Sequence, residues 1–296
     1  MRNCVFSWIA SVYPTQWVSR NRVLRALWRL MFFTIKPDKP FKMRARYYSL
    51  YAHPKKKGTL TYKIIRAGDW EPKLGAAFRR YLTPGAFILD IGANFGHYSL
   101  IASPEIGPQG KIIAFEPNPA SHVLLQENLS LLDHQNVQAE TIGLSDQNAT
   151  MQLAIDSDNP GGHSFASVNV RALGGVVEVP TYQLDQYMLD KQIDRKIDLI
   201  KIDVQGFEMR IFAGAAKTID RDKPIVFCEV TPTLLANVGD SFRDILGFFQ
   251  QRGYRLQTPI LTGAALVSYE DLEAQLLAIG SRYIDVVFVP ADVTAR

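Results

Sequence analysis

Short apolar runs alternate with amphipathic segments from about residue 70 to the end of the chain. Apolar runs bounded by turn residues predict β-strands, and apolar residues that recur every three or four positions predict helices. The strands are expected at 86–91, 111–115, 137–144, 150–155, 176–182, 197–202, 225–230, 254–257 and 284–289, and the helices at 71–82, 95–102, 121–132, 184–191, 207–213 and 241–252. Strands that alternate with helices predict an α/β fold, in which a doubly wound, mostly parallel sheet has helices on both faces.

Residues 1–66 differ in composition from the rest of the chain. They contain fifteen Lys and Arg residues and one acid, Asp38, which gives a net charge of +14. Residues 67–296 contain 18 basic and 28 acidic residues, which gives −10. Three of the four tryptophans also lie in the first region, at positions 8, 17 and 28. We therefore predict a basic, aromatic-rich N-terminal extension at 1–66, with a strand at 60–66, and a second domain at 67–296.

One segment of the extension has helical spacing. Val23, Leu24, Leu27 and Leu30 recur at positions that share one face of a helix, and arginines stand between them. A basic amphipathic helix with tryptophan nearby can lie on an anionic membrane surface. Three hypotheses stay open: the helix packs on the main domain or on a second subunit of a homo-oligomer, residues 1–35 make peripheral membrane contact, or the Arg-rich start is an organelle transit peptide.

The sequence offers no signal for a membrane span or for secretion. No apolar run reaches the roughly 20 residues that a spanning helix requires, and the start lacks the long apolar region of a secretory signal. The two cysteines, Cys4 and Cys228, lie far apart and have no zinc-binding spacing. This usage is typical of a reducing compartment. We expect a cytoplasmic protein, peripheral to the inner face of a membrane if the membrane hypothesis holds.

The segment at 87–96, Phe-Ile-Leu-Asp-Ile-Gly-Ala-Asn-Phe-Gly, carries the strongest chemical signal. It predicts a buried strand, a tight turn at Gly92 and Gly96, and the start of a helix. Such a turn lets backbone N–H groups approach a ligand, and the helix start adds a positive field. Asp90 lies in the strand, and Glu116 follows Gly96 by twenty residues, at the end of the next strand. Two carboxylate oxygens can accept both ribose hydroxyls, so the pattern predicts a nucleoside-containing cofactor.

The turn favours a cationic cofactor over a dinucleotide. The GxGxxG pattern of dehydrogenases is absent, because Asn94 stands where a second glycine would be. Asp90 would repel a pyrophosphate, but it could receive the ammonium group of a cofactor that has a sulfonium and an amino-acid tail.

Four motifs in order resemble the FkbM family of S-adenosylmethionine-dependent methyltransferases. They are FILDIGANFGHYS at 87–99, AFEPNP at 114–119, GLSD at 143–146 and LIKIDVQGFE at 199–208. The resemblance spans about residues 60–255. It implies a class I methyltransferase domain at 67–296, which is Rossmann-like with a mostly parallel seven-stranded sheet, preceded here by a helical extension. It also implies O-methylation of a hydroxyl on a sugar, a glycolipid or a related natural product.

The resemblance further implies the residues that hold S-adenosylmethionine. Matched by position, the cofactor-binding residues are Asp90, Gly92, Asn94 and Gly96 for the methionine half, Tyr98 and Ser99 beside them, Glu116 and Asn118 for the ribose, and Ser145 and Asp146 for the adenine. Gln205 is a departure, because the family commonly has glutamate at that position.

Several acids and one histidine are candidates for the chemistry of a hydroxyl acceptor. Asp203 ends a strand at the edge where the methyl group should point, Glu208 follows it, and Lys201 shares its strand face. Glu229 ends the next strand, and His163 lies in a glycine-containing loop that could close over the site. We predict catalytic roles for Asp203, Glu208, His163 and Glu229. A divalent metal at these acids is a weaker hypothesis, and we assign no metal ligands.

Other function classes fit the sequence less well. An NAD-dependent oxidoreductase or epimerase is disfavoured by Asp90 and Asn94. A nucleic-acid methyltransferase would suit the charge of +14, but the motifs for base amines and a Pro-Cys pair are absent. A non-catalytic protein that kept the fold would not need four intact acidic positions. The expected partner is a small-molecule, glycan or glycolipid acceptor, with no specific nucleic acid.

Overall fold

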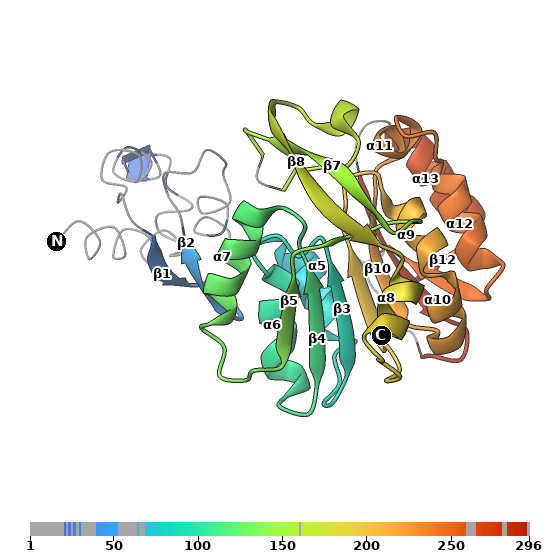
Figure 1. Ribbon diagram of the computed structural model, residues 1–296, viewed down its shortest axis with the longest axis horizontal. Helices are drawn as coiled ribbons and strands as arrows, with labels where there is room; N and C mark the ends of the chain where they lie inside the picture. Colours follow the sequence, from blue (N-terminus) through green and yellow to red (C-terminus); the bar gives the residue numbers. More distant parts are fainter. Residues whose placement is uncertain are drawn as a thin grey trace.

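A computed structural model gives the structure of the chain. It describes residues 40–52, 69–159, 161–258, 265–279 and 283–294, and the single positions 21, 23, 24, 26, 27, 30 and 64. In this part of the chain, strands and helices alternate from β3 to β13, as the hydrophobic pattern predicts (Figure 1). The fold class is the predicted one, α/β with a mostly parallel central sheet.

The central sheet has the strand order β12-β11-β13-β10-β9-β3-β4-β5. Its strands are β3 (Phe87–Ile91), β4 (Lys111–Phe115), β5 (Val137–Glu140), β9 (Leu199–Ile202), β10 (Ile225–Val230), β11 (Tyr254–Gln257), β12 (Leu266–Val267) and β13 (Ile284–Pro290). The strands from β10 to β5 are parallel, and β13 is antiparallel to both of its neighbours. Seven strands were predicted for this sheet, and its eighth strand is the two-residue β12, which is too short to give a periodic signal.

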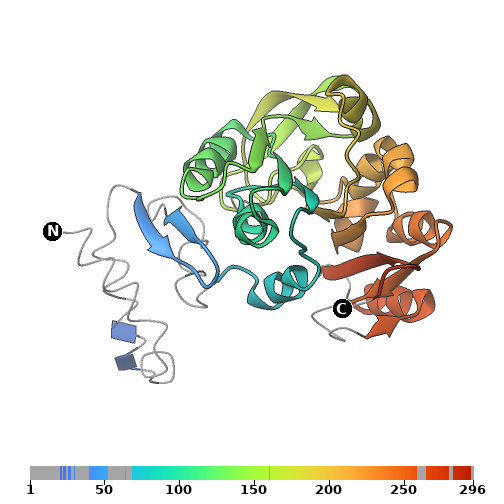
Figure 2. The ribbon, with the colours of Figure 1, turned by 90° about the horizontal axis from the view of Figure 1, so that it is seen from below.

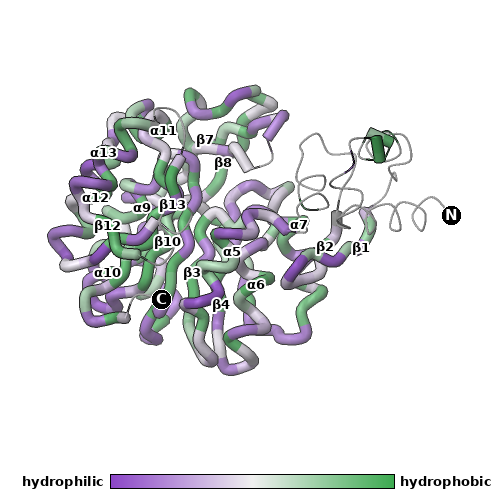
Figure 3. The backbone as a smooth tube through the Cα atoms, turned by 180° about the vertical axis from the view of Figure 1, so that it is seen from behind, coloured by the Kyte–Doolittle hydropathy of each residue, from purple (hydrophilic) through white to green (hydrophobic). Residues whose placement is uncertain are grey.

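Helices cover both faces of this sheet. They are α5 (Pro72–Arg79), α6 (His97–Ile106), α7 (Pro119–Leu129), α8 (Leu184–Asp190), α9 (Glu208–Gly214), α10 (Ala216–Asp222), α11 (Pro232–Ala236), α12 (Phe242–Gln250) and α13 (Tyr269–Ile279). Residues of α8, α9, α10, α12 and α13 pack on one face of the sheet, and residues of α5 and α6 pack on the other. Figure 3 shows hydrophobic segments along the central strands and hydrophilic segments on the outer turns. The sheet is therefore held between two apolar layers.

The third predicted strand, 137–144, is wrong in one respect. The chain forms β5, leaves the central sheet, and then forms β6 (Gly143–Leu144), which joins β7 (Ala149–Asp156) and β8 (Leu173–Tyr182) in a separate sheet. Gly143 begins β6 at a position with no room for a side chain, because a Cβ there would lie 2.5 Å from the ring of Phe165. The three-stranded sheet stands over the carboxyl ends of the parallel strands, beside α11 (Figure 1).

The extension contains a hairpin that the sequence did not predict. Strands β1 (Phe41–Arg44) and β2 (Ser49–Ala52) pair antiparallel and lie next to α7 (Figure 2). The Tyr51 N–H donates to Asn128 Oδ1 at 2.7 Å, and Leu50 is buried. The strand predicted at 60–66 falls largely outside the described residues, and the one described position, Ile64, is helical. The boundary at residue 66 stays a prediction.

The helix predicted from the spacing of Val23, Leu24, Leu27 and Leu30 is confirmed at the positions that the structure describes. Val23, Leu24, Ala26, Leu27 and Leu30 are helical. The Asn21 side chain accepts the backbone N–H groups of residues 23 and 24, at 2.9 and 3.2 Å, as a residue does at the start of a helix. Among the described residues, no helix is long and apolar enough to cross a membrane.

Candidate active site

The turn after β3 brings the backbone close to the end of β9. Gly92 has φ of +78°, and a Cβ there would lie 2.1 Å from the carbonyl oxygen of Asp203. The N–H groups of Gly92 and Ala93 both donate to Phe115 O at 3.0 Å. Gly96, with φ of +92°, is the residue before α6. The glycines are required for this close approach, so the turn predicted from the sequence is confirmed in its geometry.

Asp90 is buried at the end of β3. Ser99 donates to Asp90 Oδ2 with both its hydroxyl, at 2.6 Å, and its N–H, at 3.0 Å. Burial raises the pKa of Asp90, whereas the hydrogen bonds from Ser99 and the charge of Lys201 lower it. Ser99 therefore holds Asp90 in place.

Glu116 is fixed by backbone donors. Its Oε2 accepts the Asn94 N–H at 2.7 Å, and its Oε1 accepts the Asn118 N–H at 2.9 Å. Each oxygen keeps a second lone pair for a ligand. Burial raises the pKa of Glu116 to about 7. The Asn118 side chain accepts the Ala120 N–H at 3.0 Å, so it caps α7.

One cavity of about 480 Å³ brings most of the predicted residues together, and its size suits a small-molecule site. It is lined by Asp90, Gly92, Asn94, Tyr98, Glu116, His163, Asp203 and Glu229 among the predicted residues. The predicted residues that are not part of its lining are Gly96, Ser99, Asn118, Ser145, Asp146 and Glu208. The lining also includes Trp70, Glu71, Phe165, Gln205 and Tyr283, for which the sequence analysis proposed no role in binding or catalysis.

Buried charges gather around Lys201, at the ends of four neighbouring strands. Asp90 and Lys201 are register partners in β3 and β9, and Glu229 and Asp285 are partners in β10 and β13. Lys201 is 2% exposed, and its ammonium lies 5.0 Å from the centroid of the Tyr98 ring. Burial alone would lower the pKa of Lys201, but the neighbouring carboxylates raise it above its usual value.

The carboxylates around Lys201 come from four separate segments, at Glu71, Asp203, Glu229 and Asp285. Burial raises the pKa of Glu229 well above its usual value, and the charge of Asp203 adds to this effect. Burial likewise raises the pKa of Asp285 to about 7, against the charge of Lys201. Glu71 lies just before α5 and accepts the Tyr98 hydroxyl at 2.7 Å. Glu71 and Asp285 were not predicted from the sequence, although Asp285 is an isolated acid in an apolar strand, the same signal that identified Asp90.

Glu208 contacts the backbone next to the site and is not part of the cavity lining. Its Oε1 accepts the N–H groups of Gly206 and Val204, at 3.1 and 3.4 Å. Burial raises its pKa to about 7. The carboxylate thus stabilises the turn between β9 and α9, on the side away from the cavity.

The loop that contains His163 is anchored by a buried acid. Asp156 accepts the N–H groups of Asp158 and Asn159, both at 2.9 Å, and of Arg171, at 3.1 Å. His163 Nδ1 accepts the Asp156 N–H at 3.0 Å, and burial lowers the pKa of His163. The neutral ring therefore carries its proton on Nε2. In this arrangement His163 is a hydrogen-bond donor, which fits contact with a substrate better than the removal of its proton.

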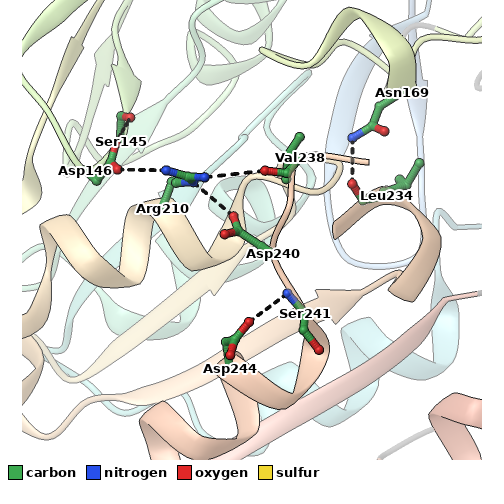
Figure 4. Close-up of polar contacts among 9 residues, drawn as sticks. All are labelled: Ser145, Asp146, Asn169, Arg210, Leu234, Val238, Asp240, Ser241 and Asp244. Atoms are coloured by element: carbon green, nitrogen blue, oxygen red, sulfur yellow. Dashed lines mark hydrogen bonds and ion pairs between the residues drawn. The ribbon is translucent and has the colours of Figure 1, made fainter. Parts of the chain in front are cut away.

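Asp146 lies in an ion-pair network. Its Oδ2 is 3.3 Å from Arg210 Nη1, and Arg210 Nε donates to Asp240 Oδ2 at 3.1 Å (Figure 4). The Ser145 hydroxyl donates to Asp146 Oδ1 at 3.0 Å. Among the described residues, no group of three His, Cys, Asp or Glu side chains is placed to hold a metal ion.

Comparisons with known proteins point to one family. The family model described as "Methyltransferase FkbM domain" matches residues 90–256. The chain is 32% identical to methyltransferase sdnD of Sordaria araneosa, over 45% of this chain and 61% of that protein. It is 27% identical to 2-O-methyltransferase NoeI of Sinorhizobium fredii (strain NBRC 101917 / NGR234), over 47% of this chain and 61% of that protein. The chain thus spans about three-fifths of the length of the curated relatives it matches.

Among solved structures, the chain is similar to methyltransferase FkbM from Methylobacillus flagellatus KT. The two share 13% sequence identity, with a TM-score of 0.39, and the match covers 97% of this chain and 59% of that chain.

Proposed function

The chain belongs to the FkbM family of methyltransferases, and we propose that it transfers a methyl group from S-adenosylmethionine to a hydroxyl of a sugar, a glycolipid or a related natural product. The observation that supports this proposal best is the contact between the two halves of the cavity. The Gly92 turn packs directly against the backbone carbonyl of Asp203, and Asp203 lines the same cavity, so a cofactor held by the turn would meet its acceptor near the Asp203 carboxylate.

The residues of the turn fit this cofactor. Gly92 lets the turn pack closely against the end of β9, because a Cβ there would lie 2.1 Å from Asp203 O. Asp90 supplies a negative charge for an ammonium group, and Glu116 supplies acceptors for two ribose hydroxyls. When bound, S-adenosylmethionine supplies a methyl group on a positively charged sulfur.

Asp203 and Glu229 would act on the acceptor. Each lines the cavity and can accept the hydrogen of a hydroxyl, which holds the oxygen in line with the methyl group and takes up its proton. Lys201 balances part of their negative charge. Trp70 and Tyr283 also line the cavity, and their rings offer apolar faces to the C–H groups of a sugar. One relative is a 2-O-methyltransferase, NoeI, and this similarity supports transfer to oxygen.

Calorimetric titration tests the cofactor first. We expect S-adenosylmethionine and S-adenosylhomocysteine to bind and NAD not to bind, with Glu116→Ala weakening the adenosyl ligands. Binding of NAD alone would favour the oxidoreductase alternative.

A screen of methyl glycosides and glycolipids with labelled S-adenosylmethionine then identifies the acceptor. Asp203→Ala should lose at least about a hundredfold in turnover and keep its affinity for S-adenosylhomocysteine. Unchanged turnover would remove Asp203 from the mechanism.

We also propose that the extension contacts an anionic membrane surface. Val23 and Leu27 are 66% and 52% exposed at helical positions four residues apart, and the sequence places Arg22, Arg25 and Arg29 around them. Apolar side chains flanked by arginines suit the boundary between acyl chains and anionic headgroups.

Flotation with phosphatidylglycerol and phosphatidylcholine vesicles tests this contact. Val23→Ser with Leu27→Ser should reduce binding to the anionic vesicles about tenfold. Leu277→Ser is the control, because Leu277 in α13 is 58% exposed. Equal binding by both variants would contradict the membrane proposal.

A further inference from the structure

The turn after β9 places a glutamine side chain between two carboxylates. Gln205 Nε2 donates to Asp203 Oδ1 at 2.8 Å and to Glu229 Oε1 at 3.2 Å. An amide nitrogen carries two hydrogens, so it can give one to each carboxylate. Asp203 follows β9 and Glu229 lies in β10, so one side chain joins the ends of two neighbouring strands.

The backbone of Gln205 is held from the other side of the cavity. Its φ is +54°, which is unusual for a residue other than glycine and persists only where the surroundings fix it. The Gln205 carbonyl accepts Asn169 Nδ2 at 2.9 Å and the Ser164 hydroxyl at 3.1 Å. Asn169 Nδ2 also donates to Leu234 O at 3.1 Å (Figure 4). The loop over the site and α11 therefore fix where the amide points.

The Gln205 amide can stabilise the two carboxylates that it contacts. Two carboxylates that line one cavity repel each other when both are ionised. A neutral donor between them stabilises the ionised forms, and it does so without adding a charge that itself titrates. The hydrogen bond that the buried Lys201 ammonium makes is to Ile202 O, at 3.2 Å, whereas Gln205 Nε2 donates to both carboxylates.

We propose that Gln205 is a positioning residue, whose amide holds the carboxylates of Asp203 and Glu229 at a fixed spacing toward the acceptor. This inference rests on the proposed function, because these are the carboxylates assigned to the acceptor hydroxyl. Beyond that function, the reaction would depend on the Gln205 amide, which acts through the two carboxylates and does not itself take up the proton.

The first test needs no acceptor. Gln205→Glu puts a third carboxylate among the other two, and three such groups cannot all ionise at this distance. Folding of this variant should therefore take up a proton that folding of the native chain does not. The urea midpoint of Gln205→Glu should fall, relative to the native chain, as the pH rises from about 5 to about 8.

Gln192→Glu is the matched control. Gln192 is exposed just after α8, its φ of +53° equals that of Gln205 within a degree, and it does not line the cavity. It makes the same change in charge, and its urea midpoint should follow the native chain. The same pH dependence in both variants would overturn the proposal.

The second test uses Gln205→Gly, because glycine tolerates the positive φ and only the amide is lost. With the acceptor from the screen, kcat should fall at least about tenfold while the affinity for S-adenosylhomocysteine changes less than about twofold. The acidic limb of the kcat–pH profile should move up by about one unit, because the carboxylates lose their shared donor. An unmoved limb would overturn the proposal. Failure of the native chain to bind S-adenosylhomocysteine would instead contradict the proposed function and leave the urea result to decide the role of Gln205.

Discussion

The two halves of the cavity are built in different ways. The cofactor half consists of one stretch of chain, from Asp90 to Glu116, and its two carboxylates are held by backbone N–H groups and by Ser99. The acceptor half draws on segments far apart in the sequence, from Glu71 to Asp285, and its carboxylates face one buried lysine and one amide. The first half depends on the path of the backbone, and the second depends on a balance of charge.

The difference leads to different weaknesses. A site made by the backbone should fail when an atom is added, since the turn has no room for it. A site made by charge should fail when one partner is removed, because the remaining charges are buried without compensation. Substitutions that add an atom to the cofactor half, or remove a charge from the acceptor half, can therefore test whether the two halves are built in these different ways.

Adding one carbon to the turn should have the largest effect. Gly92→Ala would place a Cβ 2.1 Å from Asp203 O, at a φ of +78°. We expect the free energy of unfolding to fall by more than about 4 kcal/mol, with loss of S-adenosylhomocysteine binding. Urea denaturation and calorimetry measure the two effects.

Gly85→Ala separates the clash from the backbone conformation. Gly85 has a φ of +79°, and a Cβ there would meet nothing within 4 Å. This variant should lose only about 1 kcal/mol. Equal losses at the two positions would show that the close approach to Asp203 is unimportant.

Removing the buried cation should have the next largest effect. Lys201→Met leaves Asp203, Glu229 and Asp285 without their compensating charge, and we expect a loss of about 3 kcal/mol in the free energy of unfolding. The carboxyl pKa values should rise in the folded variant, so the loss should be smaller at low pH and grow as the pH rises. Urea denaturation at several pH values tests this.

Lys223→Met is the control for a surface lysine. Lys223 lies 3.3 Å from Asp220 and 6.0 Å from the Tyr254 ring, so it has the same kinds of partner, but its side chain is 39% exposed. It should cost less than about 0.5 kcal/mol. Similar losses at the two positions would argue against a charge balance in the acceptor half.

The sequence predicted the cofactor half far better than the acceptor half, for a physical reason. Gly92, Gly96 and Glu116 act through the local path of the chain, and local path is encoded in short spacings. Glu71 and Asp285 come close to Lys201 only because α5 and the antiparallel β13 pack beside β10, and no local pattern shows that placement. Glu208 and Ser99 do not have the roles that were predicted for them, for the same reason. Their contacts hold other parts of the site, and neither residue is part of the cavity lining.

Glu116 offers a pH test of the cofactor half. Burial raises its pKa to about 7, and only the ionised carboxylate accepts both ribose hydroxyls. The affinity for S-adenosylhomocysteine should therefore rise about tenfold between about pH 6 and pH 8. For stability the sign is opposite: the folded carboxyl binds its proton more tightly than the unfolded one. Its contribution to stability is thus lost as the pH rises from about 4 to about 7.

Two variants show which residue titrates, because burial also raises the pKa of Asp285 to about 7. Glu116→Gln should abolish the pH dependence of affinity, and Asp285→Asn should keep it. A pH dependence that persists in Glu116→Gln would place the titrating group elsewhere.

The smallest expected effect concerns Asp146, which is part of neither half of the cavity lining. If Asp146 accepts the adenine amino group, it must do so with a lone pair that Ser145 and Arg210 leave free. An analogue of S-adenosylhomocysteine with hydrogen in place of that amino group should then bind about fivefold more weakly, or about 1 kcal/mol. Asp146→Asn should erase the difference, whereas Asp240→Asn, which changes the other acid on Arg210, should preserve it. Equal binding of both ligands by the native chain would restrict Asp146 to its ion pair. The adenine contacts would then have to come from groups other than the Asp146 carboxylate.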